Sequence, residues 1–186
     1  MSEIFSMTGE PGSMEVLRIL GAVLVAVSGM LLGMAFQNEM RQRMWILQDL
    51  QRGILRLRQE IEYLKVPLEE AALHTGESLQ EPMASFFTET GKKLGKLPGA
   101  SFAAVWQEME EQYLEDAPLK QEDCELIRQL GTALEQMEPG GGRVLLLFEQ
   151  RAEAALEQAC REYREKAQLY RRLGMMGGIF LVILFL

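Results

Sequence analysis

Two uncharged apolar runs, one near each end of the chain, constrain most strongly what this sequence can fold into. Residues 19–36, "ILGAVLVAVSGMLLGMAF", contain no charged side chain. A helix of that length rises about 27 Å, close to the ~30 Å of hydrocarbon in a bilayer. The run therefore predicts a transmembrane helix. A cleaved signal peptide is the alternative, because Gly33-Met34-Ala35 resembles a small-residue cleavage site, but Arg18 is the only base that precedes it.

The second run, residues 173–186, ends the sequence as "LGMMGGIFLVILFL" and is also uncharged in its side chains. A helix of this length rises only about 21 Å, which is too short to cross the hydrocarbon without thinning or help from neighbours. We expect a membrane anchor that packs on the first helix. Each segment has a pair of glycines four residues apart that would let two helix backbones approach closely: Gly29, Gly33, Gly174 and Gly178.

Basic residues next to each apolar run indicate the orientation. Arg41 and Arg43 follow the first run, whereas three glutamates dominate the segment before it. Arg171 and Arg172 stand immediately before the second run. Because basic flanks stay on the cytoplasmic side, the region between the two runs is expected in the cytoplasm, with both of its ends at the bilayer.

The formal net charge of -8 argues against a nucleic-acid-binding protein. The charge is unevenly distributed along the chain. Residues 41–66 contain six bases and three acids, residues 67–142 contain five bases and fifteen acids, and residues 143–186 contain seven bases and five acids. An acidic centre therefore lies between two basic segments.

The segments between proline and glycine marks show helical rather than alternating periodicity, so the sequence predicts an all-α fold. We expect a bundle of about six helices, flanked by the N-terminal transmembrane helix and the short C-terminal membrane helix. The predicted helices span residues 43–64, 67–75, 81–93, 100–114, 120–137 and 143–172. The corresponding domains are an N-terminal extension (1–14), a transmembrane helix (15–37), a cytoplasmic helical bundle (38–172) and a C-terminal membrane anchor (173–186).

A stripe of large aliphatic residues runs along the first helix of the bundle with the spacing 3-4-3-4-3: Leu47, Leu50, Ile54, Leu57, Ile61 and Leu64. Such a heptad seam can drive a parallel coiled-coil dimer or pack inside a bundle. The last helix offers a face of mostly small residues on which bulky side chains can interdigitate: Leu145, Phe148, Ala152, Ala155 and Ala159. We therefore favour packing of these two helices within one chain, in antiparallel orientation.

Residues suited to catalysis or metal binding do not form a recognisable pattern. His74 is the only histidine, so an imidazole-based metal site has no second histidine ligand. Residues 140–142 are three glycines before a helix, but they lack the Lys-Ser/Thr ending of a phosphate-binding loop. Four glutamates near the end of the seam are interpreted as a solvated face: Glu60, Glu62, Glu69 and Glu70.

The two cysteines, Cys124 and Cys160, are far apart and have no metal-ligand spacing, so we interpret them as ordinary helix residues. Trp106 is expected in the core, and Trp45 either against the bundle or near lipid headgroups. We expect neither an enzyme, nor a cofactor, nor a small-molecule substrate.

The order of several short motifs resembles one known family. These are "LGA" at 20–22, "LQRGILRLRQEIEYLKVPLEEA" at 50–71, Phe86-Phe87, Trp106, "LIRQLGTAL" at 126–134, and "YRRLGMMGG" before the hydrophobic tail. Together they are similar to the stage III sporulation protein AB family of endospore-forming bacteria. The chain departs from the pattern after Leu134, where it has "EQMEPGGGR".

The resemblance implies a membrane component of the channel apparatus between mother cell and forespore, similar to the platform protein of type II secretion and type IV pilus machines. It implies location in the mother-cell membrane that faces the forespore. The implied partners are the lipid bilayer and other proteins of the stage III sporulation operon, including a cytoplasmic secretion-type ATPase. A membrane-anchored helical scaffold or regulatory protein with no secretion role is the alternative.

The acidic centre is the expected contact surface for such a partner. Within it we single out five residues as partner-binding candidates: Glu69, Glu70, Glu108, Glu110 and Glu111. Contacts made by exposed carboxylates weaken as salt concentration rises.

Overall fold

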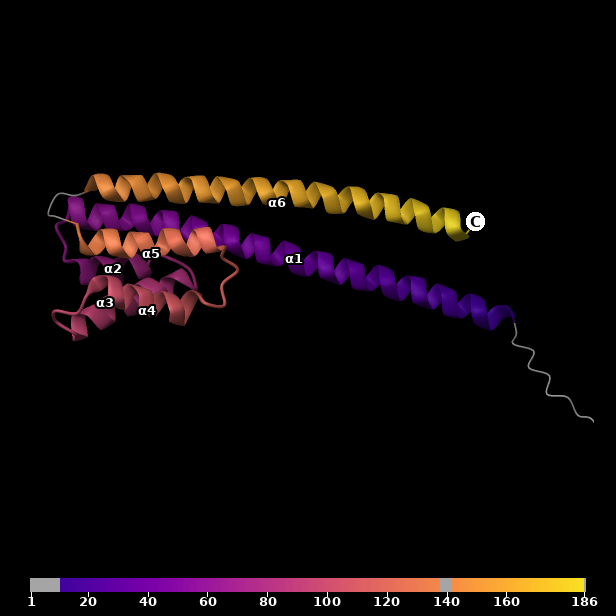
Figure 1. Cartoon of the computed structure of the whole chain (residues 1–186), viewed down its shortest axis with the longest axis horizontal. Coiled ribbons are helices and arrows are strands. Elements are labelled where there is room, and N and C mark those ends of the chain that lie inside the picture. The colour runs from indigo at the N-terminus through magenta and orange to yellow at the C-terminus, as the bar shows by residue number, and fades with distance from the viewer. Residues whose placement is uncertain (1–10, 138–141, 186) are drawn as a thin grey trace, which may run out of the picture. The chain divides into compact units, whose positions relative to one another are not determined.

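The chain forms six α-helices in a computed structural model, which describes residues 11–137 and 142–185 and the side chains chiefly of residues 38–137 and 142–169. No strand occurs over the described ranges, so the all-α prediction is confirmed. The helices are α1 (Pro11–Glu62), α2 (Leu68–Gly76), α3 (Met83–Lys96), α4 (Phe102–Leu114), α5 (Gln121–Glu135) and α6 (Gly142–Phe185) (Figure 1). The chain divides into two compact units, Met1–Asn38 and Glu39–Leu186.

The two predicted membrane segments lie within α1 and α6. Over the residues that the structure describes, no helix combines the length and apolarity needed to cross a bilayer. Most side chains of residues 19–36 and 173–186 lie outside the described ones, and so does the packing of the glycine pairs Gly29/Gly33 and Gly174/Gly178. Both membrane segments therefore remain predictions.

The two long helices run antiparallel inside the second unit. Arg43 of α1 is paired with Glu162 of α6 at 3.1 Å, and Arg58 of α1 with Glu149 of α6 at 3.0 Å. Residue numbers rise along α1 while they fall along α6, which defines the antiparallel orientation. In Figure 1, α6 and α5 lie beside this part of α1.

The aliphatic stripe of α1 is the centre of the core. Leu47, Leu50, Ile54 and Leu57 have no solvent-exposed surface, and Ile61 is partly buried against them. The α6 face predicted to receive the stripe joins the same core through Leu145, Phe148, Ala152, Ala155 and Ala159. The stripe is thus covered within one chain.

Leu64 does not belong to the stripe, contrary to the sequence prediction. Helix α1 ends at Glu62, and Lys65 adopts a left-handed backbone with φ 55° where the chain turns toward α2. The turn removes Leu64 from the helical spacing, and its side chain is 63% exposed. The sequence prediction extended the heptad spacing beyond the end of the helix and therefore assigned Leu64 to the stripe incorrectly.

An aromatic cluster joins the shorter helices. Trp106 of α4 packs edge-on against Phe86 and Phe87 of α3 and stacks on Phe102. Its indole N–H donates to the backbone carbonyl of Ile127 in α5, at 2.8 Å. Gly131 lets α5 approach the ring, because a Cβ at this position would lie only 2.7 Å from Cγ of Trp106.

Candidate partner-binding surfaces

The five acidic candidates do not form one cluster. Glu69 and Glu70 lie exposed in the first turn of α2, where carboxylates favourably face the positive end of the helix dipole. Glu108 and Glu111 are exposed on α4; Glu108 is paired with Lys93 of α3, and Glu111 accepts a hydrogen bond from Gln107. Helix α3 packs against both α2 and α4, so the two acidic pairs belong to the two neighbours of α3.

Glu110 is not part of a solvent-exposed acidic surface, and this corrects the sequence prediction. It is only 4% exposed and accepts a hydrogen bond from Nε of Arg128 on α5, at 2.8 Å. This contact raises the pKa of Arg128, mainly through the hydrogen bond from its side chain to Glu110. Glu110 therefore joins α4 to α5, and a partner has little access to it.

An acidic groove of about 370 Å³ lies between the end of α4 and the first turns of α5. Leu114, Ala117 and Leu119 supply its apolar wall. Its charged residues are three acids and one base, namely Glu110, Glu111, Glu115 and Arg128. Cys124 also lines the groove, and burial raises the pKa of its thiol. A thiol held in the protonated form is a poor nucleophile, in agreement with its interpretation as an ordinary helix residue.

A buried ionic cluster centred on Arg43 joins three helices and was not predicted. The Arg43 guanidinium donates to both carboxylate oxygens of Asp123 on α5, at 2.7 and 3.1 Å, and to Glu162 on α6. Lys120 donates to the same Glu162 carboxylate at 2.6 and 2.8 Å. Two cations thus face two carboxylates, which is the arrangement that makes a buried ion pair tolerable.

The pKa values of this cluster agree with its geometry. Burial alone would lower the pKa of Arg43, but the hydrogen bond to Asp123 and the charges of Asp123 and Glu162 outweigh it, so the net shift is upward. The hydrogen bond from Lys120 lowers the pKa of Glu162 against a smaller opposing effect of burial. Both groups are therefore held in their charged forms.

The sequence contains a signal for this cluster. Arg43 stands four residues before Leu47 and so extends the aliphatic stripe of α1 by one more position. A charged residue at such a position has to be excluded from the core or matched by buried partners. The partners, on α5 and α6, are not identifiable from local spacing.

Glu60 is a second charged residue at the core, near the other end of the stripe. It is 1% exposed, and its carboxylate contacts Arg56 at 2.8 Å and Nδ1 of His74 at 3.2 Å. The prediction that Glu60 belongs to a solvated face is therefore wrong, whereas Glu69 and Glu70 are exposed as expected. His74 acts here as a neighbour of Glu60, and within the described residues no group of three or more His, Cys, Asp or Glu is arranged to hold a metal ion.

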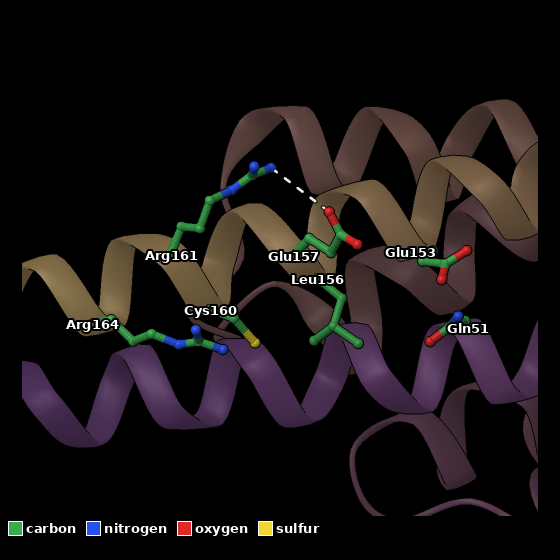
Figure 2. Close-up of a pocket in the computed structure, with 7 residues that line it drawn as sticks. All are labelled: Gln51, Glu153, Leu156, Glu157, Cys160, Arg161 and Arg164. Atoms are coloured by element: carbon green, nitrogen blue, oxygen red, sulfur yellow. Dashed lines mark ion pairs between the residues drawn. The ribbon is translucent and has the colours of Figure 1, made fainter.

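A groove of about 420 Å³ follows the contact between α1 and α6 (Figure 2). Leu156 and Cys160 point from α6 toward α1, and Gln51 faces them from α1. Arg161 points away from α1 and is paired with Glu157 at 3.9 Å. The lining mixes acids and bases, so it favours neither an anionic nor a cationic ligand.

The two tryptophans differ in environment. Trp106 is buried in the aromatic cluster, as expected, whereas Trp45 is 59% exposed on α1. Of the two alternatives predicted for Trp45, burial against the bundle is wrong, because the side chain faces outward between the partly buried Met44 and the buried Ile46. A place near lipid headgroups stays a prediction. Trp45 instead lines a groove of about 550 Å³ with the loops before α3 and α5.

Comparison with known proteins places this helical bundle in a family. Residues 18–186 match the family described as "Stage III sporulation protein AB". The chain belongs to the stage III sporulation protein AB family. The match includes both apolar runs and the whole bundle, and it confirms the family resemblance found in the sequence. The family is one of sporulation proteins, so a role in sporulation follows.

One solved structure shares the fold. It is described as "Stage III sporulation protein AB", with a TM-score of 0.53 and 19% sequence identity, covering 70% of this chain and 98% of that one. At this identity the likeness establishes the fold alone. No curated protein matches the chain.

Proposed function

We propose that this chain is a membrane platform-like component of the sporulation channel apparatus and that it docks a cytoplasmic secretion-type ATPase. The observation that carries the proposal is the family match over residues 18–186, which joins a helical bundle to an uncharged apolar run at each end. A bundle attached to a bilayer at both termini keeps a fixed face toward the cytoplasm. Such a body is suited to holding partners beside the membrane and has no need of catalytic groups.

The proposed location is the mother-cell membrane facing the forespore, with the bundle in the cytoplasm. The basic residues at 41, 43, 171 and 172 support this orientation. Two experiments test this location. A polar reporter fused after Leu186 in the full chain shows which side of the membrane the C-terminus reaches. Membrane flotation is then compared for the chain with and without residues 173–186. We expect both forms to float through residues 19–36, and the shortened form to lose membrane assembly.

The proposed contact surface consists of the exposed carboxylates of α2 and α4, namely Glu69, Glu70, Glu108 and Glu111. A partner that recognises them carries Lys or Arg at its own surface, and the other stage III operon proteins are the candidates. Glu110 is left out because it is buried, with its carboxylate bound by Arg128. The same surface would serve a scaffold with no secretion role, so the identity of the partner decides between the two functions.

The deciding experiment measures capture of the operon ATPase by the full chain in lipid nanodiscs. Reversing all four charges to Lys should weaken binding about tenfold or more, since each exposed pair contributes roughly 0.2–1 kcal/mol. A matched control reverses Glu153 and Glu165, which are exposed on α6. Equal capture by all variants would exclude the acidic surface, and no capture by the unaltered chain would favour the scaffold alternative.

A further inference from the structure

The groove beside Trp45 has the composition of a peptide-docking surface. Trp45 and Ile46 of α1 form one wall, Pro82 lies at the loop before α3, and Tyr113, Ala117 and Pro118 come from the end of α4 and the following loop. Large exposed aromatic side chains in a concave, largely apolar site are typical of protein contacts, because they bury much area with few rotatable bonds. No part of this groove is used by the ionic cluster or by the acidic surface of α2 and α4.

The charged residues that line the groove indicate which kind of peptide segment binds there. Among the described residues that line it, Glu81 and Asp116 are the charged ones, and none is Lys or Arg. Tryptophan and tyrosine faces also attract cations. A segment with Arg or Lys next to an aliphatic side chain therefore complements the groove in both charge and polarity, whereas an acidic segment or an anionic lipid headgroup does not.

The position of Trp45 in the sequence indicates which part of a partner protein supplies that basic segment. Trp45 follows the end of the first apolar run by nine residues along the chain, on the side that the basic residues Arg41 and Arg43 predict to be cytoplasmic. On the cytoplasmic side of a membrane, the flanks of transmembrane helices are enriched in Lys and Arg. We propose that the Trp45 groove binds the basic cytoplasmic flank of a transmembrane helix in a partner protein, which rests on the membrane location proposed above.

The test uses the full chain in phosphatidylcholine nanodiscs and three synthetic twelve-residue peptides without aromatic residues, composed of Arg and Leu, of Glu and Leu, and of Arg and Ser. Empty nanodiscs measure binding to lipid alone. Trp106 is buried and Trp45 is exposed, so quenching by acrylamide reports mainly on Trp45. The Arg–Leu peptide should bind and shield Trp45, and the other two should bind at least tenfold more weakly.

Variants connect this binding to the groove. Trp45→Ala should weaken the Arg–Leu peptide by about tenfold or more, as loss of an interface tryptophan commonly does, and Trp45→Phe should restore part of the affinity. The pair Glu81→Gln and Asp116→Asn should weaken it about threefold to tenfold and reduce its salt dependence. The control pair Glu115→Gln and Glu122→Gln removes acids outside the groove and should change the affinity less than twofold.

Three results would overturn the proposal. They are equal binding of the Arg–Leu and Glu–Leu peptides, unchanged affinity in Trp45→Ala, and shielding of Trp45 by brominated lipid without any peptide, which would make it a membrane contact. Self-association that disappears in Trp45→Ala would assign the groove to a second copy and overturn it as well. Flotation of the unaltered chain is measured separately, so failure of the membrane proposal is distinguishable from failure of the groove.

Discussion

Helix α5 is held at two places along its length by opposite kinds of contact. In its first turn Asp123 binds Arg43 of α1, and Glu162 of α6 completes the cluster. Further along the helix, Trp106 of α4 packs its ring against Gly131 and donates a hydrogen bond to the carbonyl of Ile127. The first contact is made by matched charges in the protein interior, and the second by shape and apolar area.

The difference shows how this bundle combines stability with a defined arrangement of helices. Apolar packing stabilises the folded chain without depending on the ionisation of side chains, but it tolerates small shifts of one helix along another. An arginine that reaches two carboxylates on two helices accepts one geometry, since displacement leaves a buried charge unpaired. We infer that the aromatic cluster stabilises the contact between α4 and α5 chiefly by burying apolar area, and that the Arg43 cluster fixes the register of α1, α5 and α6.

The largest effect is expected where a charge enters the apolar stripe itself. Leu57→Asp buries a carboxylate with no cation beside it and should lower the free energy of unfolding by several kcal/mol, on the order of an unpaired buried charge. Leu64→Asp is the matched control in the same predicted heptad, and because Leu64 is exposed it should change stability by less than about 0.5 kcal/mol. Denaturant unfolding of the full chain in detergent measures both. Equal destabilisation would contradict the boundary of the stripe at Glu62.

Breaking the ionic cluster on one side should be nearly as harmful. Arg43→Met leaves Asp123 buried without its cation, and we expect a loss of about 3–5 kcal/mol. Adding Asp123→Leu removes the stranded charge and should recover most of this loss, apart from about 1 kcal/mol for the hydrogen bond that Asp123 accepts from the Lys120 backbone N–H at the start of α5. A double variant as unstable as the sum of the single variants would show that the two residues do not act as a pair.

The contact of α5 with the aromatic cluster is tested by adding a single methyl group. Gly131→Ala places a Cβ against the Trp106 ring, so α4 and α5 have to move apart, and we expect a loss of about 1–3 kcal/mol. Gly95→Ala is the control, because a Cβ at that helical position meets no atom within 4 Å and alanine favours the helix. Unchanged stability in Gly131→Ala would mean that the contact between α5 and the ring is loose.

The smallest expected effect distinguishes the two contacts of α5 by their pH dependence. The pKa of Glu162 is lower in the folded chain than in the unfolded one, so its contribution is complete above its ordinary pKa and disappears as the pH falls through the folded value. Glu162→Gln should therefore reduce the loss of stability between pH 6 and pH 3 by no more than about 1 kcal/mol, since its partner Lys120 is about half exposed. Gly131→Ala should leave this pH dependence unchanged. An identical pH profile for wild type and Glu162→Gln would remove Glu162 from the stabilising cluster.

The sequence predicted the helices well because their signals are local. The seven-residue repeat of α1, the proline and glycine marks between helices, and the uncharged runs all depend on neighbours along the chain. Predicted and observed boundaries differ by no more than about three residues for α2 to α5. The clearest error, Leu64, arose at a helix end, where the turn at Lys65 breaks the repeat.

The candidate surface was predicted only in part. Glu69, Glu70, Glu108 and Glu111 are exposed, but Glu110 is buried. Its position four residues after Trp106 puts it on the core face of α4, so helical periodicity predicts that Glu110 is buried. The choice of Glu110 as a surface residue rested only on the number of acids near it in the sequence.

What the sequence alone determined is the class of each segment: helix, apolar run or turn, and membership of a sporulation family. What only the tertiary structure decided is which groups pair with the charged residues that helical periodicity places toward the core, and whether Trp45 is covered. Arg43 and Glu110 are buried against matching groups of other helices, and Glu60 is buried beside Arg56 of its own helix and His74 of α2, whereas Trp45 is exposed. Burial is a property of the space between elements far apart in the chain, and local periodicity carries no information about which element will fill it.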